Sequence, residues 1–315
     1  MKFTRGILWC LGVFALNGAL AMADTFQAGD VFASINNGTV AWYRSNGTFV
    51  SNLTFGSGYT TGSASDSTGL WVTNFGASTV TKWDSTGSSP TLFGGGYSTP
   101  EDILVDKSHD VFVSSTGGGL REFDSTGALL ASFAGGQRID WFDLSSDEST
   151  MYYTDESGTI HRWDLTTNTA LADLGSGGAF ALRLLGDGTL LAADRSAVNH
   201  IDATTGAILN TFTNSSFGDT GSELFSLNLD SDGTSFWTGD FTNGKLFKLK
   251  ISDGSLLQTL DTGKGAGSLY GVSVFGEECA AGCGGPPPAV PEPGSIFLLG
   301  SAFTMIGLAV RKRLA

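Results

Sequence analysis

The stretch Leu120–Phe133, LREFDSTGALLASF, decides the fold, because its pattern recurs along the chain. It predicts a β-strand, a polar turn and a second strand. Similar phrases begin at residues 40, 80, 160, 198 and 246, so successive copies are separated by 40, 40, 40, 38 and 48 residues. A period near 40 residues indicates a repeat architecture, in which each unit buries its apolar face against its neighbours.

Two further apolar runs precede each copy, so a full unit has four predicted strands, A to D. Strand B is LWVTN at 70–74, VFVSS at 111–115 and FWTGD at 236–240, and strand A of the third unit begins with EDILV at 101–105. Four-stranded units of this length, repeated radially, are the blades of a β-propeller. The predicted fold class is therefore all-β, a six-bladed β-propeller of four-stranded blades.

The first and last units are incomplete in complementary ways. The first begins directly at strand B with Val31–Ser34, and a lone apolar run, Ser268–Phe275, follows the sixth unit. A propeller has to close, since an open sheet edge pairs with other chains. We therefore predict that the C-terminal strand completes the N-terminal blade as its strand A.

Three aligned columns have structural explanations. One apolar position of strand C is predicted to pack between blades, and it holds Tyr43, Trp83, Phe123, Trp163, Ile201 and Leu249. The C–D turns begin with aspartates that are predicted to bond the backbone two residues on, namely Asp84, Asp124, Asp164 and Asp202. Glycines in the same turns supply a positive φ, namely Gly47, Gly87, Gly127, Gly206 and Gly254.

The charge balance excludes two classes of partner. The net charge is −14, and five basic residues and one acid lie in the terminal segments, which leaves −18 for the part between them. A body of this charge repels nucleic acid and anionic lipid, so neither is predicted as a partner.

The N-terminal segment, residues 1–23, has the pattern of a secretory signal peptide. Lys2 and Arg5 precede the apolar run Gly6–Leu20, and Ala21-Met22-Ala23 is an A-x-A cleavage site. Cleavage is predicted after Ala23, and the alternative is an uncleaved anchor. The propeller is accordingly assigned to residues 24–275.

The C-terminal region divides into a linker and a tail. Residues 276–289 are rich in Gly and Pro and contain Cys279 and Cys283, which could form a small disulfide in an oxidising compartment or remain thiols without a function. The tail, residues 290–315, contains a predicted transmembrane helix at 295–310. A basic cluster ends the tail, as the positive-inside rule favours on the cytoplasmic side; it consists of Arg311, Lys312 and Arg313.

A Pro-Glu-Pro motif, Pro291-Glu292-Pro293, a short apolar helix and a basic cluster stand in this order. Together they resemble the PEP-CTERM sorting signal of Gram-negative bacteria. The resemblance implies that the tail holds the precursor in the inner membrane until an exosortase cleaves near the motif. It also implies that the protein then goes to the cell envelope or to extracellular polysaccharide. The alternative is a permanent C-terminal anchor.

Acidic residues gather at the predicted mouth of the propeller, where the B–C and D–A loops share one face. Such a ring of oxygen ligands makes Ca²⁺ the candidate cofactor, and the alternative is that the acids cap strand ends and keep the surface soluble. The candidates for the metal or ligand site are Glu101, Asp102, Asp140, Asp155, Asp194 and Asp240.

Two families of propeller repeats resemble parts of the chain. MYYTDESGTIHRWD (151–164) resembles strands of the gluconolactonase family, whose propellers hold a central divalent metal, and VFVSSTGGGLREFDSTGALLASF (111–133) resembles NHL-type repeats, which are mostly binding scaffolds. The sequence contains no HExxH, G-x-S-x-G or phosphate-binding loop. The first hypothesis is a non-catalytic binding scaffold whose partner is a polysaccharide or an envelope protein. The alternative is a metal-dependent lactonase or hydrolase.

Overall fold

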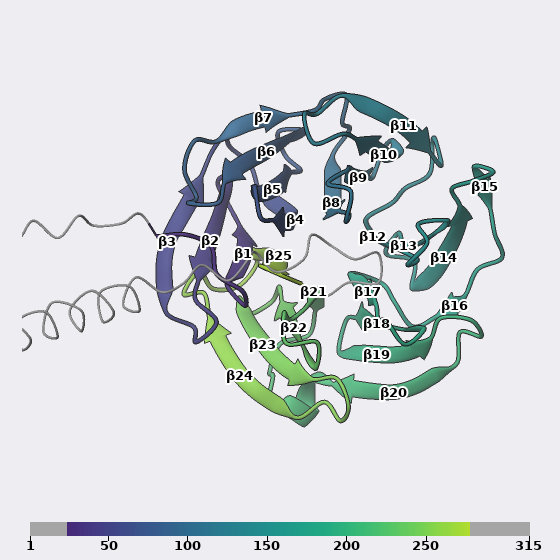
Figure 1. Cartoon of the computed structure of the whole chain (residues 1–315). Coiled ribbons are helices and arrows are strands. Elements are labelled where there is room, and N and C mark those ends of the chain that lie inside the picture. Colours follow the sequence, from purple (N-terminus) through teal and green to yellow (C-terminus); the bar gives the residue numbers. More distant parts are fainter. Residues whose placement is uncertain (1–23, 278–315) are drawn as a thin grey trace, which may run out of the picture.

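The computed structural model describes residues 24–277, which form six antiparallel sheets arranged as the blades of a propeller (Figure 1). The predicted six-bladed, all-β fold is confirmed. From inner to outer strand, the first blade contains β25 (Leu269–Val274), β1 (Val31–Ile35), β2 (Thr39–Tyr43) and β3 (Phe49–Thr54). The second contains β4 (Thr60–Asp66), β5 (Gly69–Asn74), β6 (Thr79–Asp84) and β7 (Thr91–Phe93). The third contains β8 (Pro100–Val105), β9 (Val111–Ser115), β10 (Gly119–Phe123) and β11 (Leu129–Phe133).

The remaining blades follow the same order. The fourth contains β12 (Trp141–Leu144), β13 (Thr150–Thr154), β14 (Thr159–Asp164) and β15 (Thr169–Ala170), and β16 (Gly175–Ser176) also pairs with β14. The fifth contains β17 (Leu182–Leu184), β18 (Thr189–Asp194), β19 (Ala197–Asp202) and β20 (Ile208–Thr213). The sixth contains β21 (Leu224–Leu229), β22 (Ser235–Asp240), β23 (Lys245–Lys250) and β24 (Leu256–Asp261). A short 3-10 helix, η1 (Asn214–Phe217), lies between β20 and β21.

The first blade combines the two ends of the propeller, as predicted. β25 pairs antiparallel with β1, and the register places Val274 opposite Val31 and Val272 opposite Ala33. β25 also lies close to β4, because Gly271 has no side chain: a Cβ there would lie 1.9 Å from the carbonyl oxygen of Thr61. The closing strand therefore satisfies the open edge of β1 and seals the first blade against the second.

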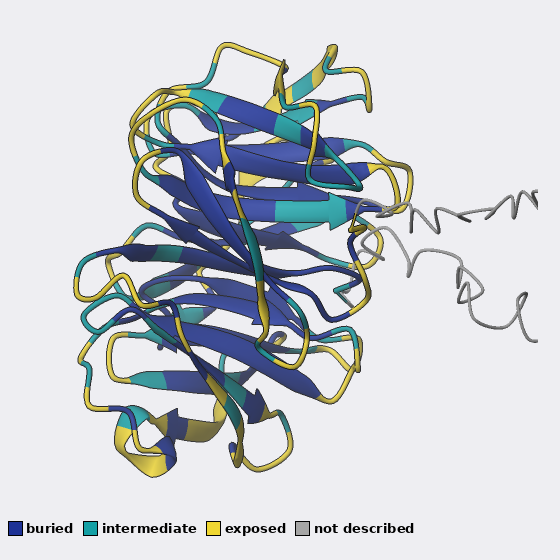
Figure 2. Ribbon diagram, turned by 90° about the vertical axis from the view of Figure 1, so that its left-hand side faces the viewer, coloured by how far each residue is buried: buried dark blue, intermediate teal, exposed yellow. Residues whose placement is uncertain are grey.

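The hydrophobic core lies between the blades. One cluster joins Phe32 and Trp42 of the first blade to Leu70 and Trp83 of the second, and comparable clusters fill the other junctions. Figure 2 shows the buried strands stacked through the body, with exposed residues mainly in the loops. The predicted strand C column is buried at five of its six positions.

The exception in the strand C column is Trp163. It is half-buried, and its indole N–H donates a hydrogen bond to the side-chain oxygen of Asn168 (2.9 Å).

The C–D turns also have the predicted chemistry. Each carboxylate accepts a hydrogen bond from the backbone N–H two residues on, at 2.8–2.9 Å, in Asp84, Asp124, Asp164 and Asp202. The pKa of all four aspartates is lowered, chiefly by a threonine hydroxyl of the turn in Asp84 and Asp124 and by the backbone N–H three residues on in Asp164 and Asp202. The turn glycines have φ between 68° and 91°, as the turn requires.

Both ends of the described chain lie on the face that carries the A–B and C–D turns. Asp24 forms an ion pair with Arg44, directly after β2 (2.6 Å), and Glu277 lies beside Leu229, the last residue of β21. Figure 2 shows both ends on the same side of the propeller. The B–C and D–A loops form the opposite face. No helix between Asp24 and Glu277 has the length and apolar character that crossing a bilayer requires.

Candidate functional site

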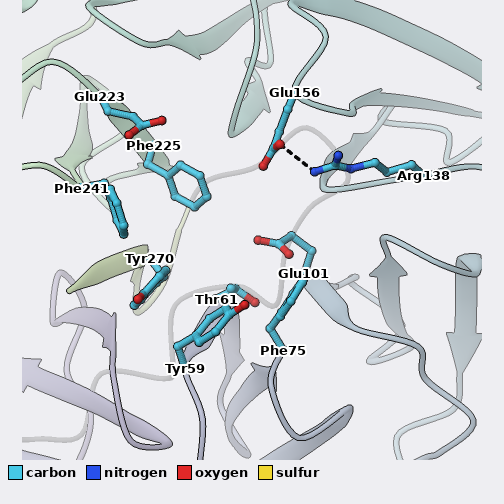
Figure 3. Close-up of a pocket in the computed structure, with 10 residues that line it drawn as sticks. All are labelled: Tyr59, Thr61, Phe75, Glu101, Arg138, Glu156, Glu223, Phe225, Phe241 and Tyr270. Carbon is cyan, nitrogen blue, oxygen red and sulfur yellow. Dashed lines mark ion pairs between the residues drawn. The ribbon is translucent and has the colours of Figure 1, made fainter. Parts of the chain in front are cut away.

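A pocket of about 290 Å³ opens on the face formed by the B–C and D–A loops (Figure 3). We call it the mouth pocket. Its lining has an aromatic part, Tyr59, Phe75, Phe225, Phe241 and Tyr270, and a polar part, Thr61, Glu101, Arg138, Glu156 and Glu223. Figure 3 shows the rings on one side of the pocket and the Arg138–Glu156 ion pair on the other.

The five aromatic residues form a continuous arc. Tyr59 stacks between Phe75 and Tyr270, with ring centroids 5.1 Å and 4.7 Å away and interplanar angles of 19° and 20°. Phe241 packs against Tyr270 at 5.3 Å and against Phe225 at 5.9 Å. Each ring is held by a neighbouring ring, so this aromatic arc is a preorganised apolar wall.

The repeat explains how residues far apart in sequence reach one pocket. Thr61, Glu101, Phe225 and Tyr270 are each the second residue of an inner strand, in β4, β8, β21 and β25 respectively. Two further rings come from B–C loops in the same way, because Phe75 follows the end of β5 and Phe241 follows the end of β22, whereas Tyr59 lies in the D–A loop directly before β4.

This regular placement is a signal that the sequence contains. The acids of this face were predicted from the sequence and the aromatic arc was not, although Phe225 matches Tyr270 in position and Phe75 matches Phe241.

Arg138 forms ion pairs with two acids on the polar side of the pocket. Its Nη2 lies 2.8 Å from a carboxylate oxygen of Asp140 and 2.8 Å from one of Glu156. Burial raises the pKa of Asp140 to about 6, against the opposing effect of Arg138. Glu223 lies 4.0 Å from Nη1 of Arg195.

Glu101 differs from these acids. It is only 6% exposed, and within residues 24–277 its carboxylate accepts no hydrogen bond and forms no ion pair. Figure 3 shows the carboxylate directed into the pocket between the aromatic arc and Glu156. Burial raises the pKa of Glu101 well above its usual range, and the nearby acids Asp140, Glu156 and Asp102 raise it further.

The other predicted mouth acids are engaged elsewhere. Asp155 lies 3.4 Å from His161, and Asp240 accepts hydrogen bonds from the backbone of Thr242 (2.6 Å) and Glu223 (3.1 Å). Asp194 ends β18 and is half-buried. Of the six predicted site residues, only Glu101 lines the mouth pocket.

Asp102 belongs to a second cluster of charges, which we call the closed end: Asp102, Asp143, Arg183, Asn228 and Glu277. Arg183 is 4% exposed and lies 3.2 Å from Asp102 and 3.1 Å from Glu277. Burial opposes the charge of Arg183, but Asp102, Glu277 and Asp143 outweigh it and raise the pKa of the guanidinium.

Glu277, which sequence analysis assigned to the linker, also accepts bonds from Asn228 (3.0 Å) and from the Leu229 N–H (3.2 Å). The cavity beside Arg183 and Glu277 measures only about 10 Å³. The closed end is therefore filled by its own side chains.

Burial dominates the titration of Asp143. Its carboxylate accepts hydrogen bonds from the backbone N–H groups of Leu144 and Leu184, both at 2.7 Å. Burial nevertheless raises its pKa to about 7, against the opposing effects of Arg183 and the Leu184 N–H.

Metal-ligating side chains do not converge in the part of the chain that the structure describes. Between residues 24 and 277, no group of three or more His, Cys, Asp or Glu side chains is arranged to hold a metal ion. The predicted signal peptide, the candidate disulfide Cys279–Cys283 and the Pro-Glu-Pro and basic residues of the tail lie outside the described residues.

The tail is similar to a known sorting signal. Residues 289–313 match the PEP-CTERM protein-sorting motif, which confirms the resemblance seen in the sequence. This signal implies an exported protein that an exosortase processes. No curated protein matches the chain in sequence.

The propeller is similar to solved structures at low sequence identity. A chain of the crystal structure of a Nidogen/Laminin complex has a TM-score of 0.62 and 13% identity, covering 81% of this chain and 99% of that one. The WD40 β-propeller domain of Doa1 has a TM-score of 0.58 and 15% identity, covering 78% and 82%. At these identities the similarity shows the fold alone.

Proposed function

We propose that this exported protein is a binding scaffold of the cell envelope or extracellular matrix, and that the mouth pocket holds its partner, a polysaccharide. The observation that carries the proposal is the mouth pocket itself, in which an apolar aromatic wall faces a few polar groups. Such a combination is typical of ligand sites. The positions of the ends support it, because Asp24 and Glu277 lie on the opposite face and leave the pocket accessible.

The lining of the mouth pocket is held by rigid elements of the propeller. Four lining residues lie on inner strands, which are buried on both sides, and the rings of the aromatic arc hold one another. A site on strands of a closed sheet array loses little conformational entropy on binding, which favours affinity.

The test compares retention on a matrix of extracellular polysaccharide from the producing bacterium. Tyr270→Ala removes the ring that bridges Tyr59 and Phe241, and truncating such an aromatic anchor costs about 2 kcal/mol, or roughly thirtyfold in affinity. Phe49→Ala is the matched control, because Phe49 is an exposed aromatic residue on an outer strand. We expect retention to fall for Tyr270→Ala alone.

Two results would overturn this proposal. Equal retention of the wild type and Tyr270→Ala would exclude the mouth pocket as the binding site. Metal-dependent turnover of a lactone or ester by the purified protein, abolished by chelation, would favour the hydrolase that the sequence offers as the alternative.

A further inference from the structure

The unpaired carboxylate of Glu101 is the most unusual feature of the mouth pocket. A buried charge is costly unless it is paired and hydrogen-bonded. Glu101 is more than nine-tenths buried, yet it has no polar partner within residues 24–277. Its carboxylate points into an open pocket rather than into packed protein (Figure 3). A ligand group that donates hydrogen bonds and carries positive charge would supply the missing partner.

The other charges of the pocket do not supply it. Arg138 is shared between Asp140 and Glu156, and Arg195 is 62% exposed at 4.0 Å from Glu223. The lining itself contains three carboxylates, Glu101, Glu156 and Glu223, and one guanidinium. The lining therefore has more acidic than basic groups, and its electrostatic potential favours a cationic ligand.

The aromatic arc decides which kind of cation fits. A metal ion such as Ca²⁺ requires six to eight oxygen ligands around it, and one side of this pocket offers only rings. An organic ammonium ion is stabilised by aromatic rings and donates hydrogen bonds to a carboxylate. Tyr59 is covered on both faces by Phe75 and Tyr270, so its own ring has no free face for stacking a ligand.

We propose that the mouth pocket binds a primary ammonium group, with Glu101 as its hydrogen-bond acceptor and the aromatic arc as its apolar wall. The proposal rests on the proposed function and deepens it: in a polysaccharide, an amino sugar with a free amine carries such a group. Glu156 and Glu223 add long-range attraction, whereas Glu101 makes the direct contact.

The experiment measures binding of a glucosamine trisaccharide to the full chain, purified in detergent, by titration calorimetry. The fully N-acetylated trisaccharide is the matched neutral ligand. We expect the free-amine form to bind at least tenfold more tightly. Glu101→Gln keeps the shape of the side chain and removes its charge, and it should reduce this affinity at least tenfold, because hydrogen bonds to charged groups are the strong ones.

The control variant is Glu122→Gln. Glu122 is a half-buried carboxylate on β10 of the same blade, and its acidic neighbours Asp106 and Asp110 lie in the A–B turn on the opposite face. This variant should bind the free-amine trisaccharide like the wild type. Melting curves of both variants check folding, and Glu101→Gln is not expected to unfold, since it removes an unpaired buried charge.

Two results would overturn the ammonium proposal: equal affinity for the free-amine and acetylated ligands, and unchanged affinity in Glu101→Gln. Tighter binding of a lysine-containing tripeptide than of the trisaccharide would overturn the amino sugar as the source of the ammonium group and assign it to a protein. A different result would overturn the proposed function: retention of Tyr270→Ala on the polysaccharide matrix that equals retention of the wild type. If glucosamine oligomers did not displace the protein from the polysaccharide matrix, the scaffold function would remain and the ammonium group would be excluded as the ligand.

Discussion

The mouth pocket and the closed end both contain carboxylates near the inner strands, but they differ in how those carboxylates are paired with cations. At the closed end, Arg183 lies within 3.2 Å of Asp102 and Glu277, and the adjoining cavity is about 10 Å³. In the mouth pocket, Glu101 has no partner between residues 24 and 277, and the cavity is about 290 Å³. Paired charge in filled space stabilises the fold, whereas unpaired charge beside open space is available to a ligand.

The largest expected effect comes from breaking the closed end. Arg183→Met leaves Asp102, Asp143 and Glu277 buried without their cation, and removing one partner of a buried ion pair costs about 3–5 kcal/mol. We expect the melting temperature to fall by roughly 10 °C. Lys107→Met is the control, because Lys107 is 59% exposed in its surface pair with Glu148 and should change stability by less than about 0.5 kcal/mol. Equal melting temperatures for the two variants would refute a structural role for Arg183.

The pH dependence of stability should be the next largest effect. Burial raises the pKa of Asp143 from 3.8 to about 7 and that of Asp140 from 3.8 to about 6. The folded state then holds these protons more tightly than the unfolded state, so stability falls as pH rises from about 4 to about 7. For the fully buried Asp143 the loss is up to about 4 kcal/mol.

The acids with a lowered pKa act at the other end of the pH range. The pKa of Asp147 is lowered to about 2, chiefly by the Ser145 hydroxyl, and the C–D turn aspartates are shifted in the same direction. Their contribution is present above pH 4 and is lost as pH falls through the folded pKa. Melting temperatures between pH 2 and pH 8 should therefore peak near pH 4–5. A steady rise to pH 8 would contradict this assignment of charges.

Removing the other side of the buried pair should have a smaller effect than removing Arg183. Glu277→Ala deletes the acceptor for Arg183, Asn228 and the Leu229 N–H, and we expect a loss of about 2–3 kcal/mol in the unfolding free energy measured with urea. The double variant Arg183→Met/Glu277→Ala should lose less than the sum of the single losses, because each removes the partner of the other. Strict additivity would show that the pair is not coupled.

The smallest effect should come from the mouth pocket. Glu101→Gln removes a buried carboxylate that lacks a partner between residues 24 and 277, so we expect no loss of stability at pH 8 and a gain of up to about 1 kcal/mol. Calorimetric melting curves of Glu101→Gln, compared with those of Arg183→Met, measure this change in stability. A loss as large as that of Arg183→Met would mean that Glu101 supports the fold, and the contrast between the two ends would disappear.

Sequence periodicity predicted the blades because every blade repeats the same local chemistry. The C–D turn aspartates and the strand C column recur at fixed positions, and the lone run Ser268–Phe275 revealed how the ring closes. The sites depend on a different kind of information. Glu101 was identified as a mouth acid, but its lack of a partner depends on how Arg138 is shared between Asp140 and Glu156, which is visible only in three dimensions.

Two features of the acidic residues are visible only in the structure. Acidic residues at strand ends suggested a ring of metal ligands, but Asp155 and Asp240 form local contacts with His161 and with backbone N–H groups. The Gly- and Pro-rich segment after Phe275 concealed Glu277, whose carboxylate reaches a residue 94 positions away. Pairings across such sequence distances leave no periodic signal.

The position of the two chain ends has a consequence for how the protein is displayed. Asp24 and Glu277 leave the propeller from the same face. A tether that followed Glu277 would therefore attach to the face opposite the mouth pocket. In that arrangement the mouth pocket would face away from the point of attachment. Cutting such a tether would release the protein without covering or reorienting the mouth pocket, so release and the proposed capture of a partner would be mechanically independent.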